Sequence, residues 1–161
     1  MIKGGCQCGT LRYAVDAPLG RASVCHCRMC QKAMAAPFGA FVDAPGLTWV
    51  RGTPAYYQSS NKVRRGFCSA CGTPLTFEWS GAPINVAIFT LDDPDVAAPV
   101  IQVGIEGRRP WVNETFDLPV RPAQDAPWLT SIISNQHPDH DTADGQPAIA
   151  PARRDERPGE D

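Results

Sequence analysis

Apolar and polar residues alternate with a period of two in several segments of the chain. Successive side chains of a β-strand point to opposite faces of a sheet, so this pattern predicts strands with one buried face. The clearest alternation covers residues 11–15, 75–79, 84–88 and 101–105. Shorter segments that also suit strands are residues 38–42, 47–50 and 62–67. The pattern therefore predicts a mostly β fold.

Proline and glycine divide the chain into short elements. The 16 prolines and 14 glycines leave little room for long helices, because proline breaks a helix interior. Turn residues separate the predicted strands at 44–46, 52–54 and 80–83. Residues 29–36 predict a helix of about two turns that ends before Pro37, and residues 127–134 give a weaker helical signal. We expect a sandwich or an irregular barrel with at most short helices.

The composition of the chain changes near residue 135. The segment from His137 onward has no aromatic residue, four prolines and many charges of both signs. Such a segment buries too little apolar surface to offset the chain entropy that folding costs. The sequence thus predicts a domain at residues 1–134 and a disordered polar tail at residues 135–161. His137 and His140 lie in this tail, and we expect them to be solvated rather than to bind a metal.

The overall charge and the N-terminal residues limit the classes of function. The 161 residues have a formal net charge of −2 and a pI near 5.9, unlike a basic nucleic-acid binder. The N-terminus lacks the apolar stretch of a signal peptide, and no apolar run is long enough to cross a membrane. We therefore expect a soluble cytoplasmic protein without nucleic-acid or membrane partners. Thiols stay reduced in the cytoplasm, so clustered cysteines there favour metal binding or catalysis over disulfides.

Seven cysteines fall into three groups with the spacings C-x-C, C-x-C-x-x-C and C-x-x-C. The groups are Cys6 and Cys8; Cys25, Cys27 and Cys30; and Cys68 and Cys71. An odd number of cysteines cannot pair fully within one chain. Gly9 and Gly72 each follow the last cysteine of a pair, where a positive φ can aim backbone N–H groups at the thiolates. Redox pairs of the thioredoxin type would need a βαβ context, which the pattern lacks.

The spacings predict two zinc sites. Two cysteine pairs supply the four tetrahedral ligands of a closed structural site, so one zinc ion is expected at Cys6, Cys8, Cys68 and Cys71. Three ligands from one loop leave a fourth position for water or substrate, as in catalytic zinc sites. A second, catalytic zinc ion is therefore expected at Cys25, Cys27 and Cys30. His26 could complete this site, but its place between two ligands favours a side chain that is turned away.

The cysteine motifs occur in a fixed order within longer segments that match a known family. These segments are Gly4–Gly9, Cys25–Lys32 with residues 37–38, Arg64–Leu75 and Ile105–Pro119. Together they span roughly residues 2–120 and resemble the glutathione-dependent formaldehyde-activating enzyme family, also called the CENP-V/GFA domain. The resemblance implies a β-tent fold and the same division of the cysteines between a structural and a catalytic zinc ion.

The resemblance also implies an activity. Founding members of the family add glutathione to formaldehyde to give S-hydroxymethylglutathione, a reaction classed with the carbon–sulfur lyases. We therefore expect a zinc-dependent carbon–sulfur lyase that joins a small thiol such as glutathione to a small aldehyde, or catalyses the reverse reaction. The alternative, from a different class of protein, is a non-catalytic zinc-stabilised binding module with the same fold.

A glutathione-like substrate carries two carboxylates, which cationic side chains can bind. Arg28 and Lys32 adjoin the group of three cysteines and Arg64 precedes the last pair, so we expect these three to contact the substrate. Residues 33–36 read Ala-Met-Ala-Ala, whereas relatives usually carry a glycine-containing turn there. We expect Met34 to narrow the pocket beside the catalytic zinc ion.

Overall fold

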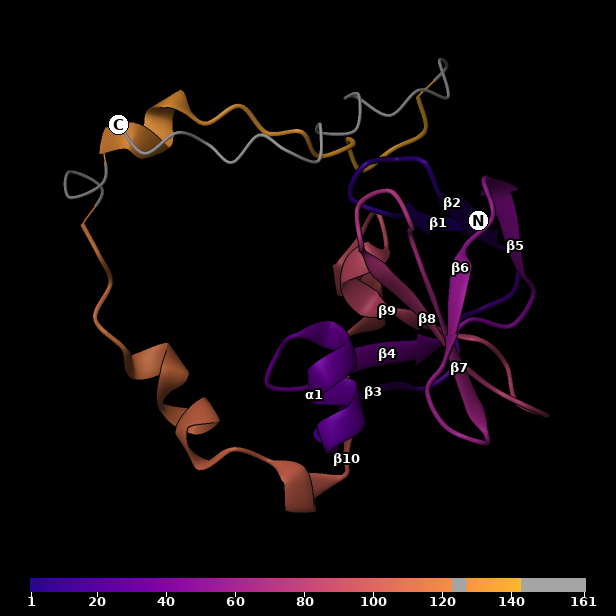
Figure 1. Ribbon diagram of the computed structural model, residues 1–161, viewed down its shortest axis with the longest axis horizontal. Coiled ribbons are helices and arrows are strands. Elements are labelled where there is room, and N and C mark those ends of the chain that lie inside the picture. The colour runs from indigo at the N-terminus through magenta and orange to yellow at the C-terminus, as the bar shows by residue number, and fades with distance from the viewer. Residues whose placement is uncertain (123–126, 143–161) are drawn as a thin grey trace.

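The computed structural model describes residues 1–122 and 127–142. Within these residues the chain is mostly β, with ten strands in two sheets, one short α-helix and several 3₁₀ turns (Figure 1). The predicted fold class is therefore confirmed. No helix in the described part of the chain is long and apolar enough to cross a membrane.

The smaller sheet holds the N-terminal end of the chain. Its strand order is β1-β2-β5, all antiparallel. The strands are β1 (Ile2–Gly5), β2 (Arg12–Val15) and β5 (Leu47–Arg51). All four residues of β2 are buried, although the alternating pattern predicted one buried face. The reason is that β2 is the central strand: Tyr13 packs edge-on against Trp49, and Arg12 is buried in ion pairs.

The larger sheet carries the rest of the strands in the order β10-β3-β4-β9-β8-β7-β6. Neighbours are antiparallel except β10, which runs parallel to β3. The strands are β3 (Ala22–Cys25), β4 (Gly39–Asp43), β6 (Ala55–Gln58), β7 (Val63–Phe67), β8 (Pro74–Trp79), β9 (Asn85–Ala87) and β10 (Ile101–Val103). Because β10 pairs with β3, it brings the chain that follows it next to the loop after Cys25.

The main core lies where the two sheets face each other. Tyr13 of the smaller sheet and Leu75 and Val86 of the larger sheet are fully buried in one cluster. Burying each side chain of this size contributes about 1.5–3 kcal/mol. Cys6 and Cys68 belong to the same cluster, so the first group of cysteines is built into the core.

The pattern along the chain located most of these elements but missed the weakest. It does not predict β1, β3 or β6, which are four residues each; β1 is half glycine, and β6 is a mostly exposed edge strand. The predicted helix is α1 (Arg28–Met34), which ends at Ala35 in the left-handed conformation with φ 49°. The weaker helical signal corresponds to the 3₁₀ segment η6 (Pro127–Ser131).

After β10 the chain leaves the sheets and returns to β1 at residues 136–142 (Figure 1). On the way it forms the 3₁₀ segments η3 (Ile105–Gly107) and η4 (Pro110–Asp117). Two earlier 3₁₀ segments, η1 (Ile88–Thr90) and η2 (Pro94–Ala97), follow β9. The segment 105–122 therefore connects the larger sheet to a region of the chain that contacts the smaller one.

The expectation that His137 is solvated is wrong. Its side chain is 4% exposed, and its backbone N–H donates to the carbonyl of Gln7 at 2.7 Å. The imidazole packs against Gly9. An added Cβ at Gly9 would lie 2.1 Å from the ring, so the imidazole fits only because residue 9 has no side chain. Asp141 nearby binds Lys3 and Arg12, and hydrogen bonds from Lys3 and then Arg12 hold the pKa of Asp141 below its usual value.

His140 is exposed, as expected. The predicted boundary between domain and tail after residue 134 stays a prediction, and residues 143–161 lie outside the described residues. Residues 137 and 141, however, show that the first part of the predicted tail is in contact with the N-terminal sheet.

Candidate metal centres

The first cysteine cluster, called the four-cysteine cluster, gathers sulfurs from two turns. One turn follows β1 and the other joins β7 to β8; the members are Cys6, Cys8, Cys68 and Cys71. All four Sγ atoms lie within 4.8 Å of one another, with 3.6 Å between Cys6 and Cys8 and 3.9 Å between Cys8 and Cys68. A tetrahedron with zinc–sulfur bonds of 2.3 Å has edges of about 3.8 Å, whereas a disulfide needs about 2.05 Å. The sulfurs therefore fit a tetrahedral metal ion and are not bonded to one another.

The two turns share the sequence Cys-Gly-Thr and the same backbone conformation. Gly9 has φ 76° and Gly72 has φ 79°, as predicted from their place after each pair. In both turns the glycine N–H donates to the carbonyl of the first cysteine, at 3.0 and 2.8 Å. The N–H of Leu11 points at Cys6 Sγ, 3.2 Å away. Backbone dipoles of this kind spread the negative charge of a metal-bound thiolate.

The threonines of the two turns support the sulfurs from the side. The hydroxyls of Thr10 and Thr73 each lie 3.1 Å from the sulfur two residues before them. Thr73 also accepts the N–H of Gln7 at 3.1 Å, which joins the two turns directly. Burial opposes ionisation of Cys71, but hydrogen bonds from Thr73 outweigh it and lower the pKa of Cys71 to about 6. Burial raises the pKa of Cys6, so a metal ion that binds here displaces protons.

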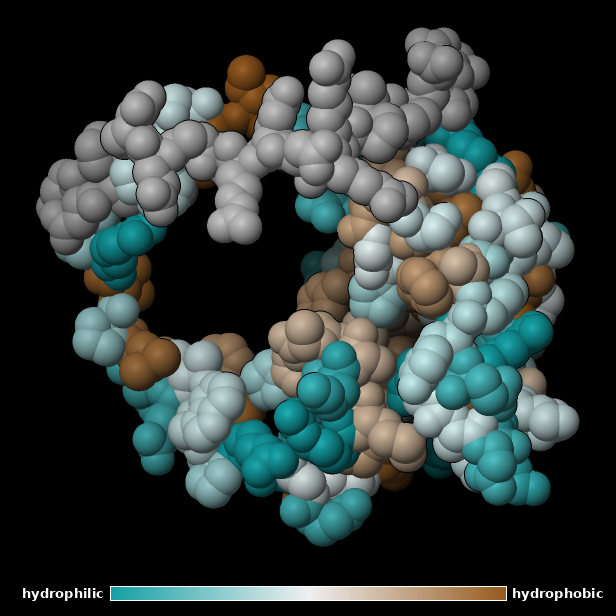
Figure 2. Space-filling model, viewed as in Figure 1, coloured by the Kyte–Doolittle hydropathy of each residue, from teal (hydrophilic) through white to brown (hydrophobic). Residues whose placement is uncertain are grey.

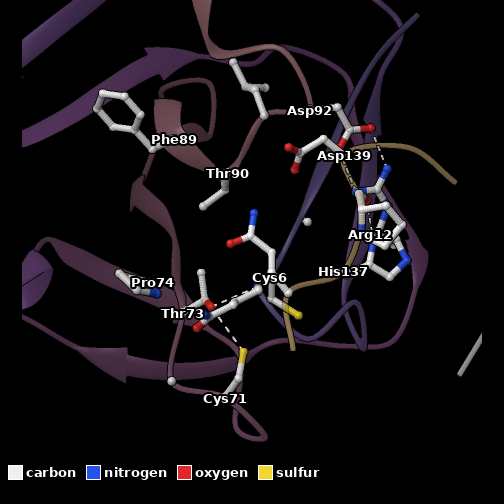
Figure 3. Close-up of a pocket in the computed structure, with 16 residues that line it drawn as sticks. Cys6, Arg12, Cys71, Thr73, Pro74, Phe89, Thr90, Asp92, His137 and Asp139 are labelled. Carbon is white, nitrogen blue, oxygen red and sulfur yellow. Dashed lines mark hydrogen bonds and ion pairs between the residues drawn. The ribbon is translucent and has the colours of Figure 1, made fainter. Parts of the chain in front are cut away.

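A cavity of about 420 Å³ separates this cluster from the returning C-terminal segment. Figure 3 shows Cys6 and Cys71 on one side of it and Arg12, Asp92 and His137 on the other. Arg12 binds Asp92 through both terminal nitrogens, at 2.7 and 2.6 Å. Arg12 and Asp92 thus neutralise each other in the wall of this cavity.

The second cluster, called the three-cysteine cluster, comes from six consecutive residues. Cys25 ends β3, Cys27 caps α1 and Cys30 lies in its first turn. The three Sγ atoms lie within 4.8 Å of one another; Cys30 is buried and the other two are half-buried. Burial raises the pKa of Cys25 to about 12, so a cation is needed for that thiol to ionise at neutral pH. This donor set also suits zinc, and the observed division of the cysteines agrees with the predicted one.

Comparison with known proteins identifies the family to which the chain belongs. The family model described as glutathione-dependent formaldehyde-activating enzyme (GFA) matches residues 1–106, which include all seven cysteines. The chain belongs to the GFA family. A solved structure of a Rhodobacter sphaeroides protein, a structural genomics target, is similar to this GFA chain with a TM-score of 0.50 and 25% identity. That match covers 63% of this chain and 99% of the other.

The GFA domain holds a buried arginine against the three-cysteine cluster. Arg65 on β7 donates from Nη2 to Cys30 Sγ at 3.4 Å and from Nε to the Ser59 hydroxyl at 3.1 Å. Its guanidinium lies 5.0 Å from the ring centre of Phe77, and the residue is 7% exposed. From the sequence, its neighbour Arg64 is expected instead. The period-two alternation of β7, with Val63 buried, could have indicated Arg65.

Only two of the three residues that were predicted to contact the substrate lie together in the structure. Arg28 and Lys32 line one cavity beside α1. Arg64 lies on β7, where it donates to Glu78 at 2.7 Å, packs over Tyr56 and borders a different cavity. Met34 is half-buried and packs with the three-cysteine cluster, where the sequence placed it.

The side chain of His26 is directed to β10. Its Nε2 lies 3.0 Å from Gln102 Oε1, and the ring packs edge-on against Phe38. The amide oxygen can only accept, so Nε2 is the donor of this hydrogen bond. Nδ1 is buried and has no hydrogen-bond partner among the described residues. The three-cysteine group therefore forms without His26, in agreement with the prediction.

Proposed function

We propose that this GFA-family chain is a zinc-dependent carbon–sulfur lyase that adds a small thiol of the glutathione type to a small aldehyde, or catalyses the reverse. The observation that carries the proposal is the three-cysteine cluster itself. Its sulfurs are close enough to share one metal ion, and no fourth cysteine, histidine or carboxylate joins them within the described residues. Three protein ligands with one position left over are typical of catalytic zinc.

Zinc held by Cys25, Cys27 and Cys30 would favour the ionised form of a substrate thiol and so supply a nucleophile at neutral pH. In the addition, the substrate sulfur forms a bond to the aldehyde carbon, and the π electron pair of the carbonyl moves to oxygen. That oxygen takes up the proton that the thiol gave up, so the reaction needs no oxidant or reductant. The same atoms in reverse order give the lyase step.

Residues around the cluster prepare it for this chemistry. Arg65 places a positive charge against Cys30, which offsets part of the negative charge that three thiolates bring. Met34, Phe41 and Phe77 pack around the sulfurs and limit the access of water. The four-cysteine cluster has no place in the reaction, because its four ligands already complete a tetrahedron. We assign it a structural role.

Cobalt substitution tests the proposal. The protein loaded with two equivalents of Co²⁺ is titrated with glutathione, and the sulfur-to-cobalt charge-transfer absorption near the ultraviolet is recorded. We expect an increase that saturates, because a further thiolate joins the metal at the three-cysteine cluster. Cys27→Ser, loaded in the same way, is the control and should not respond.

A second measurement follows the reaction itself. Exchange NMR between formaldehyde hydrate and S-hydroxymethylglutathione should speed up with the zinc-loaded protein and not with Cys27→Ser. If neither the cobalt spectrum nor the exchange rate changes at millimolar glutathione, the lyase proposal is wrong. The non-catalytic zinc-stabilised binding module would then be the better description.

A further inference from the structure

Residues 100–120, called the outer segment, expose many large apolar side chains. Eight are exposed, as many as in residues 1–99 together. They are Val100, Ile101, Val103, Ile105, Trp111, Phe116, Leu118 and Val120. Phe116 and Val120 are 91% and 90% exposed. Apolar residues that are exposed singly are ordinary on a protein surface, whereas a group of this size marks an interaction site.

The start of the outer segment is fixed to the body of the domain. Its strand β10 pairs with β3, and the turns that follow pack against the cysteine loop. An added Cβ at Gly104 would lie 2.9 Å from the backbone nitrogen of Cys27, and one at Gly107 would lie 2.4 Å from the carbonyl oxygen of His26. The buried side chain of Gln31 donates to the carbonyls of His26 and Gly107, at 2.9 and 2.8 Å. The segment is thus held in place before any partner binds, which lowers the entropy cost of binding.

The end of the outer segment projects from the domain. After residue 112 the chain runs away from both sheets (Figure 1), and every residue from 113 to 120 is exposed. Figure 2 shows hydrophobic residues on this outlying part of the chain, at the lower left. Chains that remain solvated contain few aromatic and β-branched residues, whereas the outer segment contains many. Its composition therefore indicates that another surface covers it in the native protein.

The outer segment also contains one edge of the larger sheet. β10 stands at the end of the strand order, so its outer edge pairs with no other strand among the described residues. An uncovered edge offers backbone N–H and C=O groups to another strand, and many proteins protect such edges with charged side chains. The residues of β10 are Ile101, Gln102 and Val103, all exposed and uncharged. This edge is suited to pair with a strand of another molecule.

The exposed apolar area of the outer segment is large enough for a dimer. Large apolar side chains have about 150–250 Å² of surface each, so the exposed fractions of the eight residues amount to roughly 800 Å² even at the lower value. One partner of a standard protein–protein interface buries about 800 Å². The area therefore matches what a stable association of two protein molecules requires.

The charges of the outer segment are mixed. They are carried by Glu106, Arg108, Arg109, Glu114 and Asp117. A nucleic acid or an anionic membrane surface would favour clustered basic residues instead. Charges of both signs suit contact with a second copy of the same segment, because each charge can meet its opposite there.

We propose that the outer segment is the interface through which two copies of this chain associate. The contact is two-fold: the β10 edges of the two copies run antiparallel, and the apolar side chains of each outer segment pack on the other copy. A two-fold interface uses the same surface of both subunits, so one edge strand meets another. Residues 107–120 lie beyond the part of the chain that the GFA family model matches. This interface is therefore an addition to the GFA domain and does not depend on the proposed reaction.

Sedimentation velocity of the zinc-loaded full chain tests the proposal, at protein concentrations from about 1 to 100 µM. We expect a dimer that dissociates on dilution. Phe116→Ser and Val120→Ser should each raise the dissociation constant of the dimer by roughly 10- to 100-fold, because each variant loses one buried apolar side chain. Circular dichroism and zinc content should be unchanged, since both residues are exposed in the single chain.

Phe89→Ser is the matched control for these variants. Phe89 is also 80% exposed, but it lies on η1, outside the outer segment. Its loss should change the dissociation constant by less than about twofold. A control of the same residue type and similar exposure separates the outer segment from the general stickiness of the surface.

The possible results decide the proposal in either direction. A dimer that is weakened by Phe116→Ser and Val120→Ser but not by Phe89→Ser supports it, whether or not the lyase reaction is found. A monomer at all concentrations overturns it, even if residues 100–120 then bind a vesicle or another protein. A dimer of equal stability in all three variants also overturns it, because the interface would lie elsewhere. Open-ended association that grows with concentration overturns the two-fold contact.

Discussion

Both cysteine clusters use sulfur atoms as ligands, but the sulfurs of one cluster are far apart in the sequence and those of the other are close together. The four-cysteine cluster joins a turn near residue 7 to a turn near residue 70, and two of its members belong to the main core. The three-cysteine cluster takes all its sulfurs from residues 25–30. A metal ion that closes a long loop stabilises the fold, whereas one held by a single loop orders little beyond that loop. The first arrangement suits a structural role, and the second leaves one coordination position of the metal for chemistry.

The groups that support the sulfurs differ as well. Around the four-cysteine cluster they are neutral: the hydroxyls of Thr10 and Thr73 and the N–H of Leu11. Around the three-cysteine cluster the support includes the charged Arg65. A cation beside a three-thiolate site offsets part of the negative charge of that site, which a neutral donor cannot do. The comparison therefore predicts that each cluster responds to a different kind of substitution.

Loss of one sulfur should have the largest effect, and only in one cluster. We expect Cys71→Ser to unfold the protein or make it insoluble, because structural zinc contributes about 10–16 kcal/mol, more than most small domains have in reserve. Cys27→Ser should lose one zinc ion and stay folded. Metal analysis and circular dichroism of both variants check this. The reverse pattern would show that the roles of the two clusters are exchanged.

Removal of the buried amide beside the three-cysteine cluster should have the next largest effect. Gln31→Leu leaves the carbonyls of His26 and Gly107 without their donors, at a cost of about 1–3 kcal/mol each. Urea unfolding of the zinc-loaded protein should show a loss of about 2–4 kcal/mol. Gln58→Leu, at an exposed position of edge strand β6, is the control and should change stability by less than about 1 kcal/mol. Similar losses in the two variants would contradict the special role of Gln31.

The charge beside the three-cysteine cluster should tune its metal affinity. Arg65→Gln removes the donor to Cys30, and we expect the affinity of this cluster for Co²⁺ to fall by roughly 10- to 100-fold, as is typical for partners of metal ligands. Arg64→Gln, one residue away and on the opposite face of β7, should leave that affinity unchanged. Competition with a chelator, followed through the cobalt spectrum, measures both. If Arg65→Gln instead lowered the Co²⁺ affinity of the four-cysteine cluster, the assignment of Arg65 to the three-cysteine cluster would be refuted.

The sequence predicted those features that depend on neighbours along the chain. Spacing located the cysteine groups, their glycine turns and α1, because each is decided within a few residues. Which pairs would share a metal also followed, since zinc needs four ligands and only one pairing leaves a compact set of three. Alternation likewise located most strands, because one face of each is buried.

Features that depend on packing between distant segments could not be predicted in this way. The alternation of β7 indicates that Arg65 is buried, but nothing near it in the sequence indicates its contact with Cys30, which is 35 residues away. His137 is buried because Gly9 leaves space for it, and nothing near His137 in the sequence indicates that. Arg109 lines the cavity beside α1, together with Arg28 and Lys32, because β10 pairs with β3. In each case the signal is divided between two parts of the chain.

The smallest expected effect concerns the backbone at the end of α1. Ala35 has φ 49°, so a left-handed position that glycine occupies in both turns of the four-cysteine cluster is here held by alanine. The left-handed conformation costs alanine about 1–2 kcal/mol, while glycine adds about 0.4–1 kcal/mol of entropy to the unfolded chain. Ala35→Gly should therefore stabilise the protein by roughly 0.5–1 kcal/mol in urea unfolding.

The neighbouring Ala36 provides the control for this substitution. Its φ is not positive, so Ala36→Gly gains nothing in the folded state and should destabilise by about 0.4–1 kcal/mol. Neither change removes a ligand, so the cobalt affinity of the three-cysteine cluster should stay the same if the cluster is held by its own loop. A change in affinity on Ala35→Gly would show that the strained residue sets the position of α1, and with it the spacing of Cys27 and Cys30. The local character of the three-cysteine cluster would then extend to the far end of its helix.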